Sequence, residues 1–505
     1  MAAAGRRSGR GGGRGGTRGA AHLSHRARLR GVAIAVMRSR DLRTTFPAGA
    51  LRGLLGRRAG REPTAGPVRD LRDLHWISID NDDSRDLDQL SWAERLPGGW
   101  DRVLVAVADV DRYVPKGSPL DLHAEANTTS VYMPGNVFPM LPDELSHDLT
   151  SLNPGEDRHA IVVEFSVDAA GQVRDGEIFR AQVHNRAQLA YDAVSEWLVV
   201  HGDPPPAADE RATLEQLALQ DEIARRLEAE RSRLGALDLE GVEVEHLFEE
   251  ERLSELRLQR QNRARLLIAN LMIVANGVTA RFLATRRYAS IQRVVRIPER
   301  WERIRALAAE HGDTLSAEPS SAALAGFLAR RRSADPEAYP DLSTTVIKLL
   351  GRGEYVMRGR AEESLGHFGL AVRDYMHSTA PNRRYPDLIT QRIVKAAIDG
   401  RPSPYKNVEL LQLAKQCTER EDAVNRAERH LRKSAAALVL EQRIGERFDA
   451  IVSGVSAAGV FVRISRPPAE GMLVDLRSDL DVGDRLAVRL AGVNVERGFI
   501  DFEQL

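Results

Sequence analysis

The spacing of apolar residues divides most of the chain into early strands and later helices. Residues 101–114 and 159–179 hold short apolar or alternating runs bounded by turn residues, which is typical of strands. The second run predicts a hairpin whose turn contains Ala170 and Gly171. Three later segments have the length and pattern of long helices: residues 209–234, 260–283 and 407–440. Together they predict one large mixed α/β body over residues 71–441.

The C-terminal segment, residues 442–505, has a different pattern. Short alternating strands follow one another, separated by glycine-containing turns. This is the size and pattern of a five-stranded OB-fold β-barrel. Such barrels either serve as adaptors or bind single-stranded nucleic acid, and the pattern alone leaves both functions open.

The N-terminal part is cationic, with 17 arginines against three acidic residues between Met1 and Arg72. Residues 1–20 are a Gly/Arg-rich tail with too few apolar positions to pack, which either contacts RNA or is simply disordered. Residues 21–70 contain two short apolar-periodic helices, the second opening at Pro47. They predict a small basic helical domain of helix-turn-helix or winged-helix type, although an ordinary packing module gives the same pattern.

Overall composition restricts the function classes further. The 505-residue chain balances 72 basic against 72 acidic residues, so it is not a polybasic nucleic-acid binder throughout. Its single cysteine, Cys417, excludes disulfides within the chain and a CxxC zinc site. No run of eighteen apolar residues and no cleavable leader is apparent. We therefore expect a cytoplasmic protein with no membrane partner.

The stretch SIDNDDSRDLDQL, residues 78–90, places five aspartates close together beside apolar runs. Clustered carboxylates repel one another and are costly to bury unpaired, so a cation is expected among them. Asp80 ends a predicted strand. If the chain is extended from Arg85 onward, Asp86 and Asp88 project to one side and Leu87 to the other.

Hard divalent cations suit such a site, because Mg²⁺ needs only a few carboxylates together with substrate phosphate. A calcium loop of EF-hand type is disfavoured, since its sixth position is Arg85 instead of Gly and its twelfth is Ser91 instead of Glu. A solvated acidic turn remains the alternative.

A second candidate site lies at residues 376–400. Asn382 ends a turn, Arg383 and Arg384 follow, and Pro386 is placed for the first turn of a helix. Paired guanidiniums at a helix N-terminus favour phosphate oxygens, although a surface arginine pair is the simpler interpretation. With a carboxylate metal site in the same body, the combination indicates phosphoryl chemistry.

The chain also resembles the RNB family, the 3′→5′ exoribonucleases of ribonuclease II and ribonuclease R type. The resemblance is carried in order by DLHWISIDNDDSRDLDQL, VAVADVDRYVPKGSPLDLHA, TSVYMPGNVFPMLPDELSHDLTSLNPGEDRHAIV, LGHFGLAVRDYMHSTAPNRRYPDL and NRAERHL. It implies a multidomain α/β (α+β) architecture with an RNB catalytic domain at 71–441 and a C-terminal OB fold of the S-one RNA-binding type, and the pattern adds the helical N-terminal domain at 21–70. It also implies a processive, Mg²⁺-dependent enzyme that hydrolyses single-stranded RNA to nucleoside 5′-monophosphates, and we expect this enzyme to be a monomer.

The resemblance also implies roles for individual residues. One or two Mg²⁺ ions, or Mn²⁺ in their place, are held by Asp80, Asp86, Asp88 and Gln89. Asp88 and Arg383 are the catalytic pair, with Arg383 on the scissile phosphate. RNA is contacted by Tyr132, Tyr191 and Glu428, and the paired guanidiniums add Arg384 to the expected RNA contacts. Core packing for the tyrosines and a solvated helix position for Glu428 are the alternatives.

Three departures from the family pattern matter. Gln89 stands where the family usually has a fourth aspartate, so metal binding should be weaker unless Asp82 or Asp83 substitutes. Residues 290–295 lack an aromatic residue that relatives often carry. The usual pair of N-terminal cold-shock barrels does not fit before Asp70.

Gln89 also motivates a rival hypothesis from another class, a catalytically weakened RNA-binding or regulatory protein of the same fold. A DNA-directed exonuclease with the same metal chemistry is a third hypothesis. Release of mononucleotides from RNA separates the first hypothesis from the second, and activity on DNA identifies the third.

Overall fold

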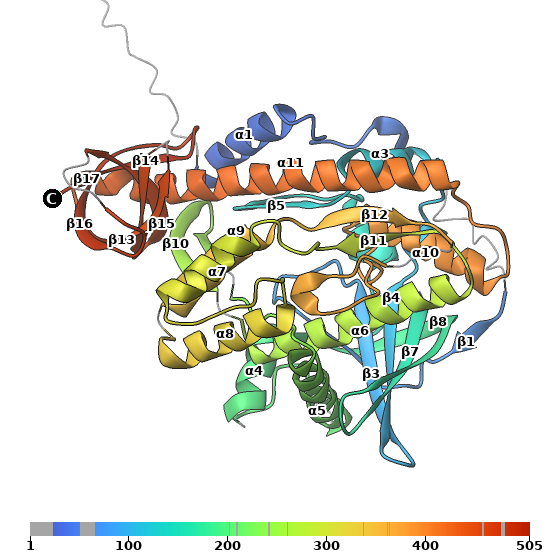
Figure 1. The fold of residues 1–505 in the computed structure, drawn as a ribbon. Helices are drawn as coiled ribbons and strands as arrows, with labels where there is room; N and C mark the ends of the chain where they lie inside the picture. The colour runs from blue at the N-terminus through green and yellow to red at the C-terminus, as the bar shows by residue number, and fades with distance from the viewer. Residues whose placement is uncertain are drawn as a thin grey trace, which may run out of the picture.

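The computed structural model describes residues 24–50 and 66–505, apart from positions 201, 209–210, 241–242, 260, 337, 361, 363, 457–458 and 476–479. A large α/β body carries a small β-barrel at one end, and the long helix α11 runs from the barrel across the body (Figure 1). The predicted tail at residues 1–20 and most of the second basic helix lie outside the described residues.

The body is built on a six-stranded sheet in the order β1-β8-β2-β3-β4-β7, and β7 also pairs with β8, so that the sheet closes on itself. The predicted hairpin is confirmed, because β7 and β8 pair antiparallel around Gly171, whose φ of +82° suits glycine. The strands are β1 (Val68–Asp70), β2 (Trp76–Asp80), β3 (Gln89–Leu96), β4 (Trp100–Ala108), β7 (Asp157–Asp168) and β8 (Val173–Ala190).

The long helices pack against this sheet and against one another, and the three predicted ones are present. Among the described residues one helix, α6, has the length and hydropathy of a membrane span. Its Leu267, Leu271 and Leu283 are fully buried in the core shared with the sheet, so α6 is a core helix. The helices of the body are α3 (Pro119–Asn127), α4 (Tyr191–Val200), α5 (Arg211–Arg233), α6 (Arg263–Thr285), α10 (Tyr385–Ile398) and α11 (Asn407–Leu440).

Smaller units are attached to the body. Three helices between β11 and β12 form a core of their own around Trp301 and Phe327, and the apolar pattern gave no indication of them. They are α7 (Trp301–Glu310), α8 (Ser321–Ala334) and α9 (Tyr339–Leu350). The paired short strands are β5 (Val131–Met133) with β6 (Asn136–Phe138), β9 (Glu243–Glu249) with β10 (Arg252–Gln259), and β11 (Ser290–Val294) with β12 (Glu354–Arg358). Single turns of helix are η1 (Val110–Arg112), η2 (Glu144–Leu149), η3 (Phe368–Leu370) and η4 (Glu441–Arg443).

The C-terminal segment is a closed five-stranded barrel in the order β13-β14-β15-β17-β16, as predicted. Its inner residues, such as Val462 and Phe502, are fully buried and share one core with the end of α11. The barrel strands are β13 (Arg447–Ser456), β14 (Gly459–Ser465), β15 (Pro468–Asp475), β16 (Arg485–Asn494) and β17 (Phe499–Gln504).

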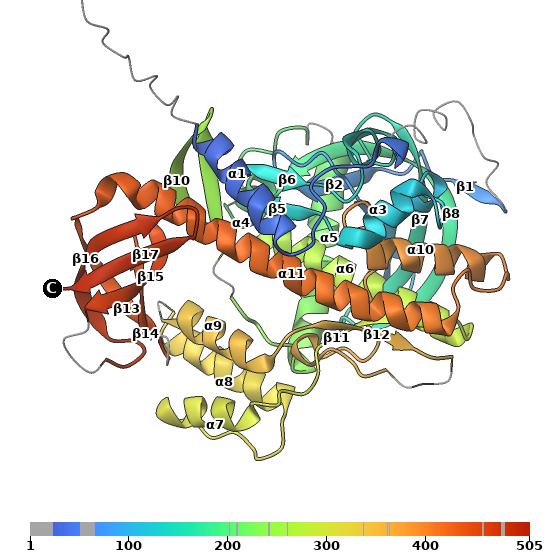
Figure 2. The same cartoon turned by 90° about the horizontal axis from the view of Figure 1, so that it is seen from above.

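The first described helix, α1 (His25–Arg38), is capped by the Ser24 side chain, which accepts the Ala27 N–H. It lies along α11, as both views show (Figures 1 and 2). Leu29 and Met37 are fully buried in the core formed with α11 and the barrel. Within the described residues, the predicted N-terminal helical unit is thus docked on the two other units.

Candidate active site

The acidic loop lies between two strands of the closed sheet. β2 ends at Asp80, as predicted, but β3 begins only at Gln89, so the extended strand expected from Arg85 starts four residues late. Ser151 holds the intervening chain: its Oγ accepts the Leu87 N–H (3.1 Å) and lies 2.7 Å from the carbonyl oxygen of Arg85. These contacts fix the loop without strand geometry, because hydrogen bonds to the backbone replace those of a ladder.

Asp88 lies at the centre of the site and is only 2% exposed. Its Oδ1 accepts the backbone N–H of Asn382 (2.9 Å) and its Oδ2 accepts the Nε–H of Arg383 (3.3 Å). The Arg383 side chain is 44% exposed, so part of it remains accessible beyond this contact. The structure therefore brings the two predicted catalytic residues together from opposite parts of the chain.

The two other aspartates lie beside Asp88. Asp86 Oδ2 accepts the hydroxyl of Tyr132 (3.1 Å), whereas the buried Asp80 Oδ2 has no hydrogen-bond partner. Burial raises the pKa of both Asp80 and Asp88 to about 7; Arg383 opposes this rise and Asp86 adds to it. The site is therefore short of positive charge, and an added cation relieves the cost of burying the two carboxylates.

These residues fit a divalent metal of the Mg²⁺ type in donor chemistry. In the described part of the chain, no three or more His, Cys, Asp or Glu side chains lie close enough together to hold a metal ion by themselves. Mg²⁺ does not require such a group, since water and substrate phosphate complete its shell. Gln89 is buried at the start of β3. Its role as a metal ligand stays a prediction.

Two tyrosines flank the aspartates. Tyr132, on β5, is 44% exposed and its backbone N–H donates to Glu428 Oε1 (3.0 Å) on α11. Tyr191 opens α4, and the Arg265 guanidinium lies 4.5 Å above its ring. Burial raises the pKa of Tyr191 to about 12, and the nearby charge of Asp80 adds to that rise. Both rings are thus next to the aspartates, and their contact with RNA stays a prediction.

Arg384 has a different environment from Arg383. Its Nη2 donates to Asp387 Oδ1 (2.7 Å), which also accepts the Ala380 N–H (2.8 Å). Arg384 and Asp387 therefore brace the turn that presents Arg383. RNA binding by Arg384 stays a prediction.

Several residues that build the site were missed by the sequence analysis. The Asn382 N–H, the Ser151 hydroxyl and the Thr150 hydroxyl lie within motifs that carry the resemblance, but a backbone donor or a small hydroxyl has no pattern of its own. Arg265 follows the N-cap Asn262 by three residues and donates to Asn81 in the acidic loop (2.7 Å). A basic residue in the first turn of a helix, where the dipole disfavours it, was the available signal.

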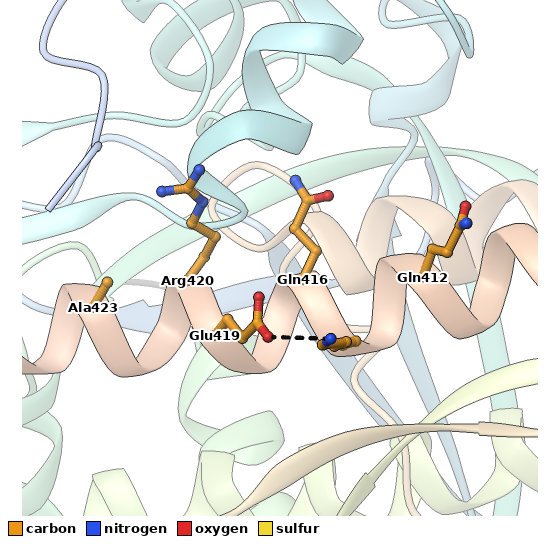
Figure 3. Close-up of a pocket in the computed structure, with 6 residues that line it drawn as sticks. Gln412, Gln416, Glu419, Arg420 and Ala423 are labelled. Carbon is orange, nitrogen blue, oxygen red and sulfur yellow. Dashed lines mark ion pairs between the residues drawn. The ribbon is translucent and has the colours of Figure 1, made fainter.

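A cavity of about 570 Å³ lies elsewhere, along the face of α11 on which Gln416 contacts Glu125 and Arg420 contacts Asp41. Figure 3 shows that Gln416 and Arg420 point to the same side of the helix, while Glu419 pairs with a neighbouring lysine. The lining residues are Gln412, Lys415, Gln416, Glu419, Arg420 and Ala423. None of them is a predicted site residue.

Comparison with known families agrees with this geometry. Residues 68–400 match the RNB domain, which is well over half of the chain. The chain belongs to the RNB family. Residues 446–505 match the RNase II-type exonuclease C-terminal S1 domain, over the barrel. The resemblance in sequence and the predicted fold class are thereby confirmed.

Named relatives within the RNB family extend over most of the chain. Ribonuclease R of Escherichia coli (strain K12) is 31% identical over 481 residues, covering 87% of this chain and 58% of that protein. The first curated relatives are covered over 56–61% of their own length. This chain thus spans somewhat more than half of each.

Experimentally determined structures show the same RNB fold. Mycoplasma genitalium RNase R in complex with ribose methylated single-stranded RNA superposes with a TM-score of 0.85 at 23% identity, covering 94% of this chain and 77% of that one. Yeast Ssd1, a pseudonuclease, gives a TM-score of 0.67 at 18% identity, covering 91% of this chain and 58% of its own. The fold is therefore shared with a protein that is not a nuclease, and the site residues have to decide the activity.

Proposed function

We propose that the chain is a processive 3′→5′ exoribonuclease that hydrolyses single-stranded RNA to nucleoside 5′-monophosphates. The observation that carries this proposal is the contact of Arg383 with the buried Asp88, beside two further aspartates. Carboxylates that attract a metal, next to an arginine whose side chain is partly exposed, are what hydrolysis of a phosphodiester requires. The relatives named ribonuclease R support the same activity.

In the proposed mechanism Asp80, Asp86 and Asp88, with help from Gln89 or water, would hold one or two Mg²⁺ ions. When bound, such metals lower the pKa of water and offset charge on the phosphate. Asp88 keeps the Arg383 side chain in place through Nε, and the outer nitrogens of Arg383 donate to the phosphate oxygens on which charge accumulates. The low exposure of Asp88 strengthens these interactions.

The remaining predicted residues would bind the RNA strand. Tyr132 and Tyr191 would stack on bases near the 3′ end, which tolerates any sequence because every base has a π face. Glu428, through the Tyr132 backbone, would set where the first of these rings lies. Arg384 and the barrel would add contacts to the strand, and binding should weaken as salt rises. The cytoplasmic location, the monomeric state and the absence of a membrane partner stay predictions.

The direct test is an assay of purified protein on 3′-end-labelled single-stranded RNA with Mg²⁺. We expect release of labelled nucleoside 5′-monophosphate, loss of that release with EDTA, and recovery with added Mg²⁺ or Mn²⁺. A DNA oligonucleotide of the same sequence should remain intact. A shifted but uncut RNA would support the RNA-binding rival, and equal cleavage of DNA would support the third hypothesis.

Gln89→Asp is expected to lower the Mg²⁺ concentration for half-maximal activity, by roughly threefold to tenfold, because an anionic oxygen replaces a neutral one. Titration of initial rates with Mg²⁺ measures this. Asp82→Asn and Asp83→Asn serve as comparisons, since both side chains lie exposed in the same loop. A rise in the Mg²⁺ requirement for either would show that it compensates for Gln89, and no change in Gln89→Asp would contradict a ligand role.

A further inference from the structure

The turn that carries Arg383 contributes a second group to the site, the backbone N–H of Asn382. This N–H donates to Asp88 Oδ1 (2.9 Å), and Asp88 Oδ2 accepts the Nε–H of Arg383. The two donors thus fix the rotation of the Asp88 carboxylate. Whatever places the Asn382 backbone therefore also places the catalytic pair.

Other contacts hold the turn on either side of Asn382. Asn276 Oδ1 accepts the Ser378 N–H (2.9 Å), and Asp387 accepts the Ala380 N–H (2.8 Å). After the turn, the Arg383 carbonyl accepts the Ser130 N–H (2.9 Å). Asn382 itself is 1% exposed, and its side chain has a single recorded partner, the hydroxyl of Thr150.

The Thr150 hydroxyl lies 2.6 Å from the Asn382 amide and 2.8 Å from the Leu145 carbonyl oxygen, and it is 3% exposed. A hydroxyl has one proton to donate. If it donates to the amide, the buried Asn382 NH₂ is left without a partner. If it donates to Leu145, the amide can turn its NH₂ toward Thr150, so that one N–H gains an acceptor and the amide oxygen loses its partner. In both arrangements Thr150 is what anchors the Asn382 side chain.

We propose that Thr150 is a positioning residue for the Asp88–Arg383 pair. Its hydroxyl connects the end of η2 to Asn382, and through the Asn382 N–H it sets the orientation of the Asp88 carboxylate. Thr150 touches neither of the two catalytic side chains, so it acts only through Asn382. The inference deepens the proposed nuclease function and rests on it for its kinetic consequence, but not for its structural one.

The kinetic test compares Thr150→Val with Thr150→Ser, which removes only the methyl group and keeps the hydroxyl. For Thr150→Val we expect kcat on single-stranded RNA to fall roughly 10- to 100-fold, because small misplacements of catalytic groups have effects of that size. KM should change by less than about twofold, and Thr150→Ser should retain most of the wild-type kcat. Thr213→Val is the matched control, since Thr213 is a buried threonine on α5 whose hydroxyl is hydrogen-bonded to His75.

A second variant removes the other partner of the hydrogen bond between Thr150 and Asn382. Asn382→Ala removes the amide but keeps the backbone N–H, and we expect the same loss of kcat as for Thr150→Val. In the double variant the losses should not add, because both changes break one connection. Additive losses, a kcat for Thr150→Val within twofold of wild type, or a Thr150→Ser variant as slow as Thr150→Val would each overturn the proposal.

Hydrogen exchange separates this inference from the nuclease function. In the protein without metal or RNA, the peptide spanning residues 378–388 should exchange roughly fivefold to tenfold faster in Thr150→Val, and at the wild-type rate in Thr150→Ser and Thr213→Val. Equal exchange in all four proteins would contradict the inference. If wild-type protein cleaves no RNA while the exchange rates differ as expected, the proposed function fails and the positioning role of Thr150 stands.

Discussion

Asp88→Asn is expected to abolish nucleotide release, lowering kcat by about 10³-fold, while the affinity for single-stranded RNA changes by less than about threefold. The substitution keeps the size of the side chain but removes its charge and one of its two acceptors. The Asn382 N–H and the Arg383 Nε–H then compete for a single oxygen, and the new NH₂ group faces a donor. Losses of this size are typical when a preorganised charge is removed from an active site.

Single-turnover cleavage of 3′-end-labelled RNA, together with binding of the same RNA in EDTA, measures both quantities. Asp73→Asn is the matched control, because Asp73 is exposed just before β2 and the change in charge is the same. It should leave kcat unchanged. Turnover by Asp88→Asn near the wild-type rate would remove Asp88 from the mechanism, and a parallel loss of RNA binding would indicate a role in binding.

Arg383→Ala is expected to lower kcat by about 10²- to 10³-fold, because the guanidinium is the one cation that contacts Asp88 among the described residues. Arg383→Lys should recover less than a tenth of that loss, since lysine has neither the Nε–H that meets Asp88 nor a fork of donors for phosphate. The distinction tests geometry separately from charge.

Steady-state kinetics on single-stranded RNA provide the measurement, with Arg211→Ala as the control at a residue on α5 whose side chain is 92% exposed. Full activity of Arg383→Lys would show that a point charge is sufficient. Unchanged kcat in Arg383→Ala would show that the contact with Asp88 has only a structural role.

Local patterns predicted the parts of the fold that depend on neighbouring residues. The end of β2 at Asp80, the turn at Gly171 and the start of α10 near Pro386 all follow from short-range rules for strands, turns and helix caps. The barrel is similarly predictable, because its strands alternate and some of its connections contain glycine, such as Gly483 and Gly498.

The contacts that assemble the site could not be derived in this way. Asp88 meets Asn382 and Arg383 only after the sheet closes and α10 docks, and nothing in the spacing of either motif contains that distance. The resemblance to the RNB family indicated that Arg383 belongs with the aspartates. It did not indicate that a backbone N–H holds one of them.

The acidic loop shows why alternation alone was insufficient there. From Arg85 to Asp88 the residues alternate as a strand would, yet Ser151 takes the hydrogen bonds that a neighbouring strand would otherwise supply. The three-helix unit between β11 and β12 was missed for another reason: its helices are short and bury their apolar residues against one another, not against the main core.

The contact between Glu428 and the Tyr132 backbone fixes the position of Tyr132 along α11. The barrel packs along the same helix from His430, whose ring nitrogen lies 3.0 Å from the Glu496 carbonyl oxygen, to Leu440 at its end. Tyr132 and the barrel are therefore held in fixed positions by one continuous helix. If both bind the RNA strand as proposed, an oligonucleotide too short to reach from Tyr132 to the barrel is held at one end only. Its dissociation rate should therefore be higher than that of an oligonucleotide that reaches both.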